Sequence, residues 1–149
     1  MKTDWWPIAL LMLVGLVGCS ESARPPAEPL AQVANRALAE GKDATLNVGF
    51  ARFLGLKADQ PMPVKRIQLE TGGVTNMLNV LREDPNTIIL SERRQRLTTF
   101  YLTDRSGLLR RAVVNDGAVA DGGITNLSLE AAAAGFEKHK QLWLQANAP

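Results

Sequence analysis

The sequence predicts an α+β fold: an antiparallel β-meander of four to five strands, flanked by an N-terminal helix or helices and a C-terminal helix. Three observations support this prediction. Apolar residues recur with helical spacing after Pro29 and again near the C-terminus. Between Val64 and Asn115, turn signals instead recur about every 10 to 13 residues and separate short segments rich in Ile, Val, Leu, Thr and aromatic residues. Helices outside a run of short strands indicate an α+β domain.

The first helix is expected directly after Pro29. Proline suits the first turn of a helix, where its missing N–H would have no partner. Gly41 is placed to end the helix. The residues that repeat at intervals of three and four are Leu30, Val33, Ala34, Ala37 and Leu38.

The segment that begins at Asp43 has two interpretations. The favoured one is a second helix capped by Asp43, with Leu46, Phe50, Phe53 and Leu54 on one face. The alternative is a strand. Gly49 would cost a helix about 1 kcal/mol, and in a strand one face would contain the apolar residues at even-numbered positions, Leu46, Val48, Phe50, Leu54 and Leu56. The residues Gln60 to Pro63 end the segment in either case.

The central part of the chain contains the predicted strands. Asn76 and Asn79 are poor strand formers, so the second segment keeps a helical turn as an alternative. The predicted strands are Lys65 to Glu70, Val74 to Arg82, Thr87 to Glu92, Leu97 to Thr103 and Leu108 to Asn115. The turns between them are predicted at Thr71 to Gly73, Asp84 to Asn86, Arg94 to Arg96 and Asp104 to Gly107.

A Gly-rich loop from Asn115 to Gly123 precedes the last helix, which Asn126 or Ser128 is expected to cap. This helix is expected to lie across one face of the sheet, with the first helix beside it. Phe100 and Tyr101 are adjacent in a strand and therefore point to opposite faces. The apolar side of the last helix contains Leu129, Ala132, Ala133, Phe136, Leu142 and Trp143.

The first eighteen residues have the three parts of a signal peptide. Lys2 gives a positive start, an apolar core begins at Ile8, and Gly18 is a small residue at the end. The core has about eleven residues, fewer than the roughly 20 that a membrane-spanning helix needs. The next residue is Cys19, and Leu16, Val17, Gly18 and Cys19 resemble the lipobox of bacterial lipoproteins. The alternative is an ordinary N-terminal helix in which Cys19 is incidental.

The resemblance to bacterial lipoproteins implies a covalent lipid anchor. In that family a diacylglycerol is transferred to the thiol of the lipobox cysteine, here Cys19. The chain is cut between Gly18 and Cys19, and the new amine receives an acyl chain such as palmitate. Each buried methylene contributes about 0.8 kcal/mol, so two or three chains attach the protein permanently. The implied location is the cell-envelope membrane facing the periplasm, and Ser20 in place of Asp favours the outer membrane.

The chain is therefore divided into residues 1–18 as signal peptide, 19–29 as lipidated cysteine and flexible tether, and 30–149 as one α+β domain. The tether SESARPPAEP has too few apolar residues to form a core. Cys19 is the only cysteine, so the domain contains no disulfide. The net charge of +2 is too small to predict a nucleic-acid partner.

No catalytic residue, metal ligand or cofactor is predicted apart from the lipid on Cys19. His139, the only histidine, is expected to be solvated between Lys138 and Lys140. No serine has glycine two residues before and after it, as a nucleophile elbow requires. A zinc site would need three or four His or Cys ligands, and a sequence with one histidine and one cysteine cannot supply them. A periplasmic hydrolase is thus the less favoured interpretation.

Arginine residues are the candidates for anion or partner binding, because guanidinium groups bind carboxylates and phosphates through paired hydrogen bonds. Arg110 and Arg111 are expected to approach the first three along the neighbouring strand. The alternative is a solvated set of charges that protects the sheet from edge-to-edge pairing. The candidates are Arg93, Arg94, Arg96, Arg110 and Arg111.

These observations predict a lipid-anchored lipoprotein of the cell envelope that works by binding, as an accessory or assembly factor of an envelope complex. The expected partners are membrane lipid, through Cys19, and an envelope protein. The accessory role predicts an exposed apolar or Arg-lined patch on the sheet. Binding of peptidoglycan or lipopolysaccharide through the arginines is the alternative function.

Overall fold

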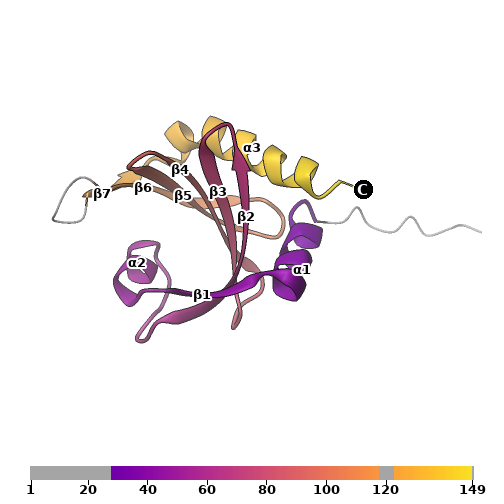
Figure 1. The fold of residues 1–149 in the computed structure, drawn as a ribbon. Coiled ribbons are helices and arrows are strands. Elements are labelled where there is room, and N and C mark those ends of the chain that lie inside the picture. Colours follow the sequence, from indigo (N-terminus) through magenta and orange to yellow (C-terminus); the bar gives the residue numbers. More distant parts are fainter. Residues whose placement is uncertain (1–27, 118–122, 149) are drawn as a thin grey trace, which may run out of the picture.

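The computed structural model describes residues 28–117 and 123–148. The predicted cleavage and lipidation sites at Gly18 and Cys19 lie outside these residues. Within the described residues, three helices and seven strands follow one another (Figure 1). They are α1 (Ala31–Glu40), β1 (Lys42–Leu46), α2 (Val48–Phe53), β2 (Met62–Thr71), β3 (Val74–Leu81), β4 (Thr87–Arg94), β5 (Leu97–Asp104), β6 (Leu109–Asp116), β7 (Gly123–Leu127) and α3 (Leu129–Ala146).

The strands form one antiparallel sheet in the order β1-β2-β3-β4-β5-β6-β7. The predicted α+β class, the meander and the C-terminal helix are confirmed. The predicted count of four to five strands is wrong, because β1 and β7 extend the sheet at both ends. The five central strands were each predicted to within a few residues of their observed bounds.

The two additional strands form where the sequence pattern is short or mixed. In the ambiguous segment after Gly41, both interpretations hold in part: Lys42–Leu46 is a strand and Val48–Phe53 is a helix. The N-cap of α2 is Asn47, whose Oδ1 accepts a hydrogen bond from the N–H of Phe50 at 2.7 Å, and not Asp43. β7 falls between the predicted Gly-rich loop and α3, which is capped by Ser128.

Both faces of the sheet are packed. α1 and α3 cover one face, as predicted, and form what we call the helix-covered core. On the opposite face α2 and the residues after it cover one part of the sheet and form a second core. β3 and β4 are covered on both faces, so residues 78–81 and 88–91 are buried without interruption, polar Asn79 and Ser91 included. The helix-covered core includes Leu30, Val33, Leu78, Ile88, Leu90, Tyr101, Phe136 and Trp143; the second includes Ala51, Leu54, Val64, Leu81, Ile89, Leu102 and Val113.

The sheet is curved. Figure 1 shows β1 and the first half of β2 bending away from the other strands and running beneath them toward α2. The register of β5 and β6 shifts between Leu102 and Thr103, and such irregularities increase bending. The face opposite α1 and α3 is therefore concave, and α2 closes only one end of it. No helix within residues 28–117 and 123–148 is long and apolar enough to cross a membrane.

Candidate functional site: a concave groove around Arg66

The concave face contains an open groove between α2 and the sheet. Its volume is about 490 Å³, within the range of ligand-binding clefts. The rings of Phe50 from α2 and Phe100 from β5 lie 4.5 Å apart between centroids at one side of it. The lining residues are Thr45, Leu46, Asn47, Gly49, Phe50, Arg66, Met77, Phe100, Asn115 and Ile124.

Strand register explains why these side chains meet. Directly paired residues of an antiparallel sheet share a face, so pairing places Met77, Ser91 and Phe100 in one row across β3, β4 and β5. The neighbouring row on the same face begins with Arg66 of β2 opposite Asn79 of β3. The row that contains Met77 and Phe100 thus lies beside the row that contains the Arg66 cation.

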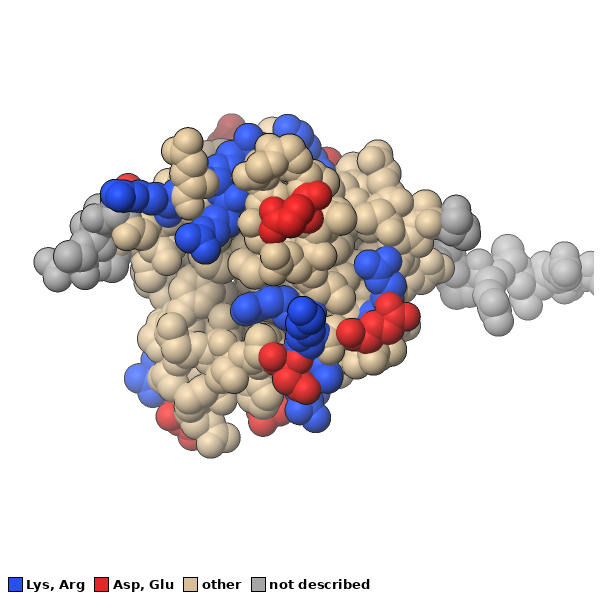
Figure 2. All heavy atoms as spheres, viewed as in Figure 1, with Lys and Arg blue, Asp and Glu red and all other residues tan. Residues whose placement is uncertain are grey.

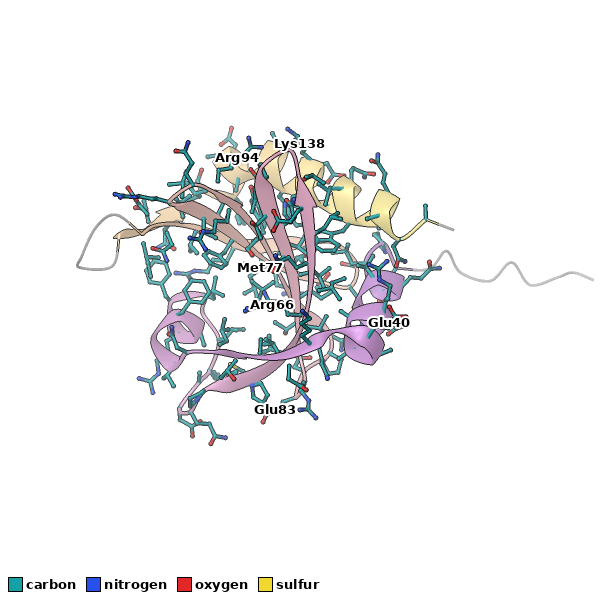
Figure 3. The ribbon with its side chains drawn as sticks, viewed as in Figure 1. Glu40, Arg66, Met77, Glu83, Arg94 and Lys138 are labelled. Atoms are coloured by element: carbon teal, nitrogen blue, oxygen red, sulfur yellow. The ribbon has the colours of Figure 1, made fainter. Side chains whose placement is uncertain are left out.

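Arg66 is held in a defined position. Its Nε donates a hydrogen bond to Oδ1 of Asn79 at 2.7 Å, and the Asn79 side chain is buried. The two Nη atoms of Arg66 have no hydrogen-bond partner within the described part of the chain. Figure 3 shows Arg66 and Met77 extending into the space between the sheet and β1 with α2. A guanidinium fixed at Nε and free at both Nη atoms presents a fork suited to a carboxylate.

The Ser91 hydroxyl is a second polar group on this face that has no hydrogen-bond partner among the described residues. Ser91 is completely buried between Met77 and Phe100 in the register. Leaving a buried hydroxyl unpaired costs about 1–3 kcal/mol. The groove therefore combines apolar side chains with a free guanidinium fork, and the unpartnered hydroxyl of Ser91 is buried beneath it.

The predicted arginine patch is divided by the sheet topology. Arg93, Arg94 and Arg96 lie at the β4–β5 turn, whereas Arg110 and Arg111 lie at the start of β6. Leu97 pairs with Asp116, but Leu102 pairs with Arg111, so about 17 Å of strand separates the two ends. The structure does not bring Arg110 and Arg111 to the first group, because β6 begins at the far end of β5.

Arg110 and Arg111 also have partners of their own. Arg110 Nη2 lies 2.8 Å from Asp104 Oδ2. Burial alone would raise the pKa of Asp104, but hydrogen bonds from Ser106 and Arg110 outweigh it and hold that pKa below its usual value. Arg111 Nη2 donates to Asn126 Oδ1 at 3.0 Å, and its guanidinium lies 5.8 Å from the ring centroid of Phe53. Both side chains stabilise the fold locally.

The other three predicted arginines are exposed around the β4–β5 turn. Arg93 Nε donates to the carbonyl of Gln95 at 3.3 Å, and Arg94 Nε donates to Glu92 Oε1 at 2.5 Å. Arg93 projects on the concave face, in the row that also contains Thr98. A role for these three side chains in anion binding stays a prediction.

The prediction that His139 is solvated is wrong. It is 2% exposed on the face of α3 that meets the sheet. Its Nε2 accepts a hydrogen bond from the Trp143 indole at 3.0 Å, so the proton of the neutral ring is on Nδ1, which lies 3.8 Å from Glu92 Oε2. Burial lowers the pKa of His139 to about 4, although Glu92 opposes this shift. The spacing of Ala132, Phe136, His139 and Trp143 already places the histidine on the apolar face of the helix.

The groups around His139 are enclosed between α3 and the sheet. Tyr101 lies beside it, with ring centroids 5.9 Å apart, and burial together with Glu92 raises the pKa of the Tyr101 hydroxyl. These groups lie beneath α3, and His139 and Tyr101 are 2% and 6% exposed. Within residues 28–117 and 123–148, no three His, Cys, Asp or Glu residues are grouped to hold a metal ion.

The residues of the groove were not predicted from sequence as a site. Arg66 was part of a predicted strand, and Asn79 was noted only as a poor strand former. An asparagine within an apolar strand was the available signal, since a buried amide needs hydrogen-bond partners. Its partner, Arg66, is thirteen residues away and becomes its neighbour only through the β2–β3 register.

Comparisons with known proteins add no family to this description. No protein-family model matches the chain, and neither a curated protein nor a solved structure is significantly similar to it.

Proposed function

We propose that this chain is a lipid-anchored protein of the cell envelope that works by binding a partner protein in its concave groove. The lipid on Cys19 holds it at the membrane, and the groove receives an acidic side chain of the partner flanked by apolar residues. The observation that supports the proposal is the Arg66 guanidinium, fixed by buried Asn79 and free at both Nη atoms beside Met77.

The composition of the groove favours a protein partner. Arginine, methionine and the aromatic residues, phenylalanine included, are enriched at protein interfaces, and Arg66 lies with Phe50 and Phe100 in the same groove. Figure 2 shows Lys and Arg side chains gathered near the centre of this face, beside a hollow. Binding of peptidoglycan or lipopolysaccharide through all five predicted arginines is not proposed, since Arg110 and Arg111 are remote from the others and paired.

The proposal can be tested by cross-linking in living cells. A photoreactive residue in place of Thr45, which is exposed at the groove, should form a covalent adduct with a specific envelope protein. Arg66→Gln keeps a donor for Asn79 but removes the charge, and we expect about a tenfold loss of adduct or more, the effect of one charged hydrogen bond. The matched control, Arg82→Gln at the exposed position directly after β3, should leave the adduct unchanged. Equal adduct yields from the two variants would contradict the proposal.

The lipid anchor gives a separate prediction. Cys19→Ala removes the thiol that receives the diacylglycerol, so the precursor should remain uncut and keep its full length. Mass spectrometry of the purified protein distinguishes this precursor from the mature form, which should begin at residue 19 and contain the mass of the acyl chains. A mature N-terminus at any other residue would exclude the lipobox interpretation.

A further inference from the structure

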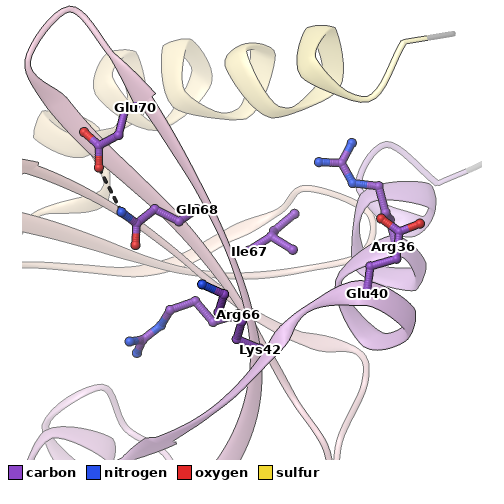
Figure 4. Close-up of a pocket in the computed structure, with 7 residues that line it drawn as sticks. All are labelled: Arg36, Glu40, Lys42, Arg66, Ile67, Gln68 and Glu70. Atoms are coloured by element: carbon purple, nitrogen blue, oxygen red, sulfur yellow. Dashed lines mark hydrogen bonds between the residues drawn. The ribbon is translucent and has the colours of Figure 1, made fainter.

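Half of β2 has a neighbouring strand on one side only. β1 pairs with β2 from Leu46 opposite Met62 to Lys42 opposite Arg66, and there the pairing ends. β3 continues along β2 as far as Thr71. Figure 4 shows that the chain passes from α1 into β1 at this point, while β2 continues beyond the start of β1. Residues 67–71 therefore form a free edge of the sheet.

The register shows which backbone groups this edge presents. The carbonyl of Pro63 accepts a hydrogen bond from the N–H of Arg82 at 3.1 Å, so the odd-numbered residues of β2 bond toward β3. Backbone groups alternate in direction along an antiparallel strand, and the even-numbered residues face the other way. Arg66 meets Lys42 of β1, but the N–H and C=O groups of Gln68 and Glu70 have no strand opposite them.

Hollows lie on both sides of the same edge. One, of about 430 Å³, follows the edge beside α1. The other, of about 580 Å³, lies between β2 and α3 and is lined in part by Leu69 and Leu142. Ile67 and Leu69 are half-buried at the margin of the helix-covered core, and Figure 4 shows Ile67 on the side of β2 that faces α1. A strand added to β2 would place alternate side chains over this apolar margin.

The charges along the edge favour one orientation of an added strand. A strand antiparallel to β2 runs the same way as β1, so its C-terminus would lie against Lys42. Arg36, Lys42 and Arg66 line the hollow at this end, with Glu40 as the acid among them. Glu70 lies toward the other end and already accepts hydrogen bonds from Gln68 and Thr75. The cations favour a carboxylate at the end of the added strand.

We propose that the edge of β2 from Ile67 to Thr71 binds the C-terminal segment of a partner protein as an additional antiparallel strand. The backbone of Gln68 and Glu70 supplies the hydrogen bonds, the margin at Ile67 and Leu69 takes alternate apolar side chains, and Lys42 with Arg36 and Arg66 receives the terminal carboxylate. Strand addition of this kind gains affinity from main-chain bonds and specificity from side-chain pockets. This surface shares Arg66 with the concave groove, but the backbone edge at Gln68 and Glu70 lies outside that groove, so a variant at Gln68 tests this proposal separately from the proposed function.

The experiment uses the full chain in a lipid nanodisc and a synthetic peptide in which valine and threonine alternate up to a free C-terminal carboxylate. We expect the peptide to slow hydrogen exchange at the amides of Gln68 and Glu70. Amidation of its C-terminus should weaken binding about tenfold, as expected for loss of a charged hydrogen bond. Gln68→Pro removes an outward N–H without removing a bond to β3 and should abolish binding, whereas Gln68→Ala keeps the N–H and should bind normally.

Three results obtained with the peptides would overturn the proposal. They are failure of the free-carboxylate peptide to bind, equal binding by Gln68→Pro and Gln68→Ala, and equal binding of the free and amidated peptides. Protection of both amides without peptide, rising with protein concentration, would instead show that the edge pairs with a second copy of the chain and would also overturn it. Slow exchange at Leu90, in the centre of β4, verifies that each variant is folded.

Discussion

Trp143→Ala is expected to lower the free energy of unfolding by about 3–5 kcal/mol, the usual cost of truncating a large buried aromatic residue. Trp143 is 1% exposed and packs in the helix-covered core with Phe136 and Tyr101. Its indole also donates the hydrogen bond to His139 Nε2, so the variant leaves a buried ring nitrogen without a partner. Urea unfolding followed by circular dichroism measures the loss.

Two further variants separate packing from hydrogen bonding. Trp143→Phe keeps most of the ring volume and removes the donor, so it should cost about 1–3 kcal/mol, the penalty for an unpaired buried polar atom. Leu129→Ala is a control on the same helix, because Leu129 is 48% exposed. A change at such a site is usually within about 0.5 kcal/mol. If Trp143→Ala costs no more than Leu129→Ala, α3 does not pack on the sheet as described.

The second large effect is expected on acidification. The pKa of His139 is about 4 in the folded protein, against 6.5 for a free side chain. Below pH 6.5 the unfolded chain therefore binds a proton that the folded chain does not, and stability falls until the pH reaches about 4. This difference between the two pKa values corresponds to about 3 kcal/mol in the free energy of unfolding. The free energy of unfolding should decrease by roughly this amount between pH 7 and pH 4, as measured by urea titrations at each pH.

His139→Gln tests the origin of this pH dependence. Its amide can still accept from the Trp143 indole but does not titrate, so most of the loss between pH 6.5 and pH 4.5 should disappear. Hydrogen bonds from Lys140 and Gln141 hold the pKa of Glu137 below its usual value of 4.5, and Asp43 and Asp104 also have lowered pKa values. Stability contributed by lowered carboxyl pKa values is lost only as the pH falls below about 4.5. An unchanged pH profile in His139→Gln would exclude the histidine as its source.

Local sequence determined most of the fold because the relevant signals act over a few residues. A tight two-residue hairpin turn requires positive φ at both central residues, which glycine adopts readily, and both Gly72 and Gly73 have it. Alternating or continuous apolar segments between such turns then formed the central strands. The ends of the sheet were missed for a physical reason: β1 and β7 have five residues each, and their local composition does not distinguish a short strand from a loop or helix.

The two proposed binding surfaces depend instead on pairing between residues that are far apart in the sequence. The sequence by itself determined the candidate anchor at Cys19, the order of central strands and the helix that ends the chain. Only the tertiary structure decided that Arg66 meets Asn79, that Arg111 is remote from Arg93, and that β1 leaves half of β2 uncovered. These relations arise from strand register and sheet curvature, which are set by packing across the whole domain and not by the residues adjacent in the chain.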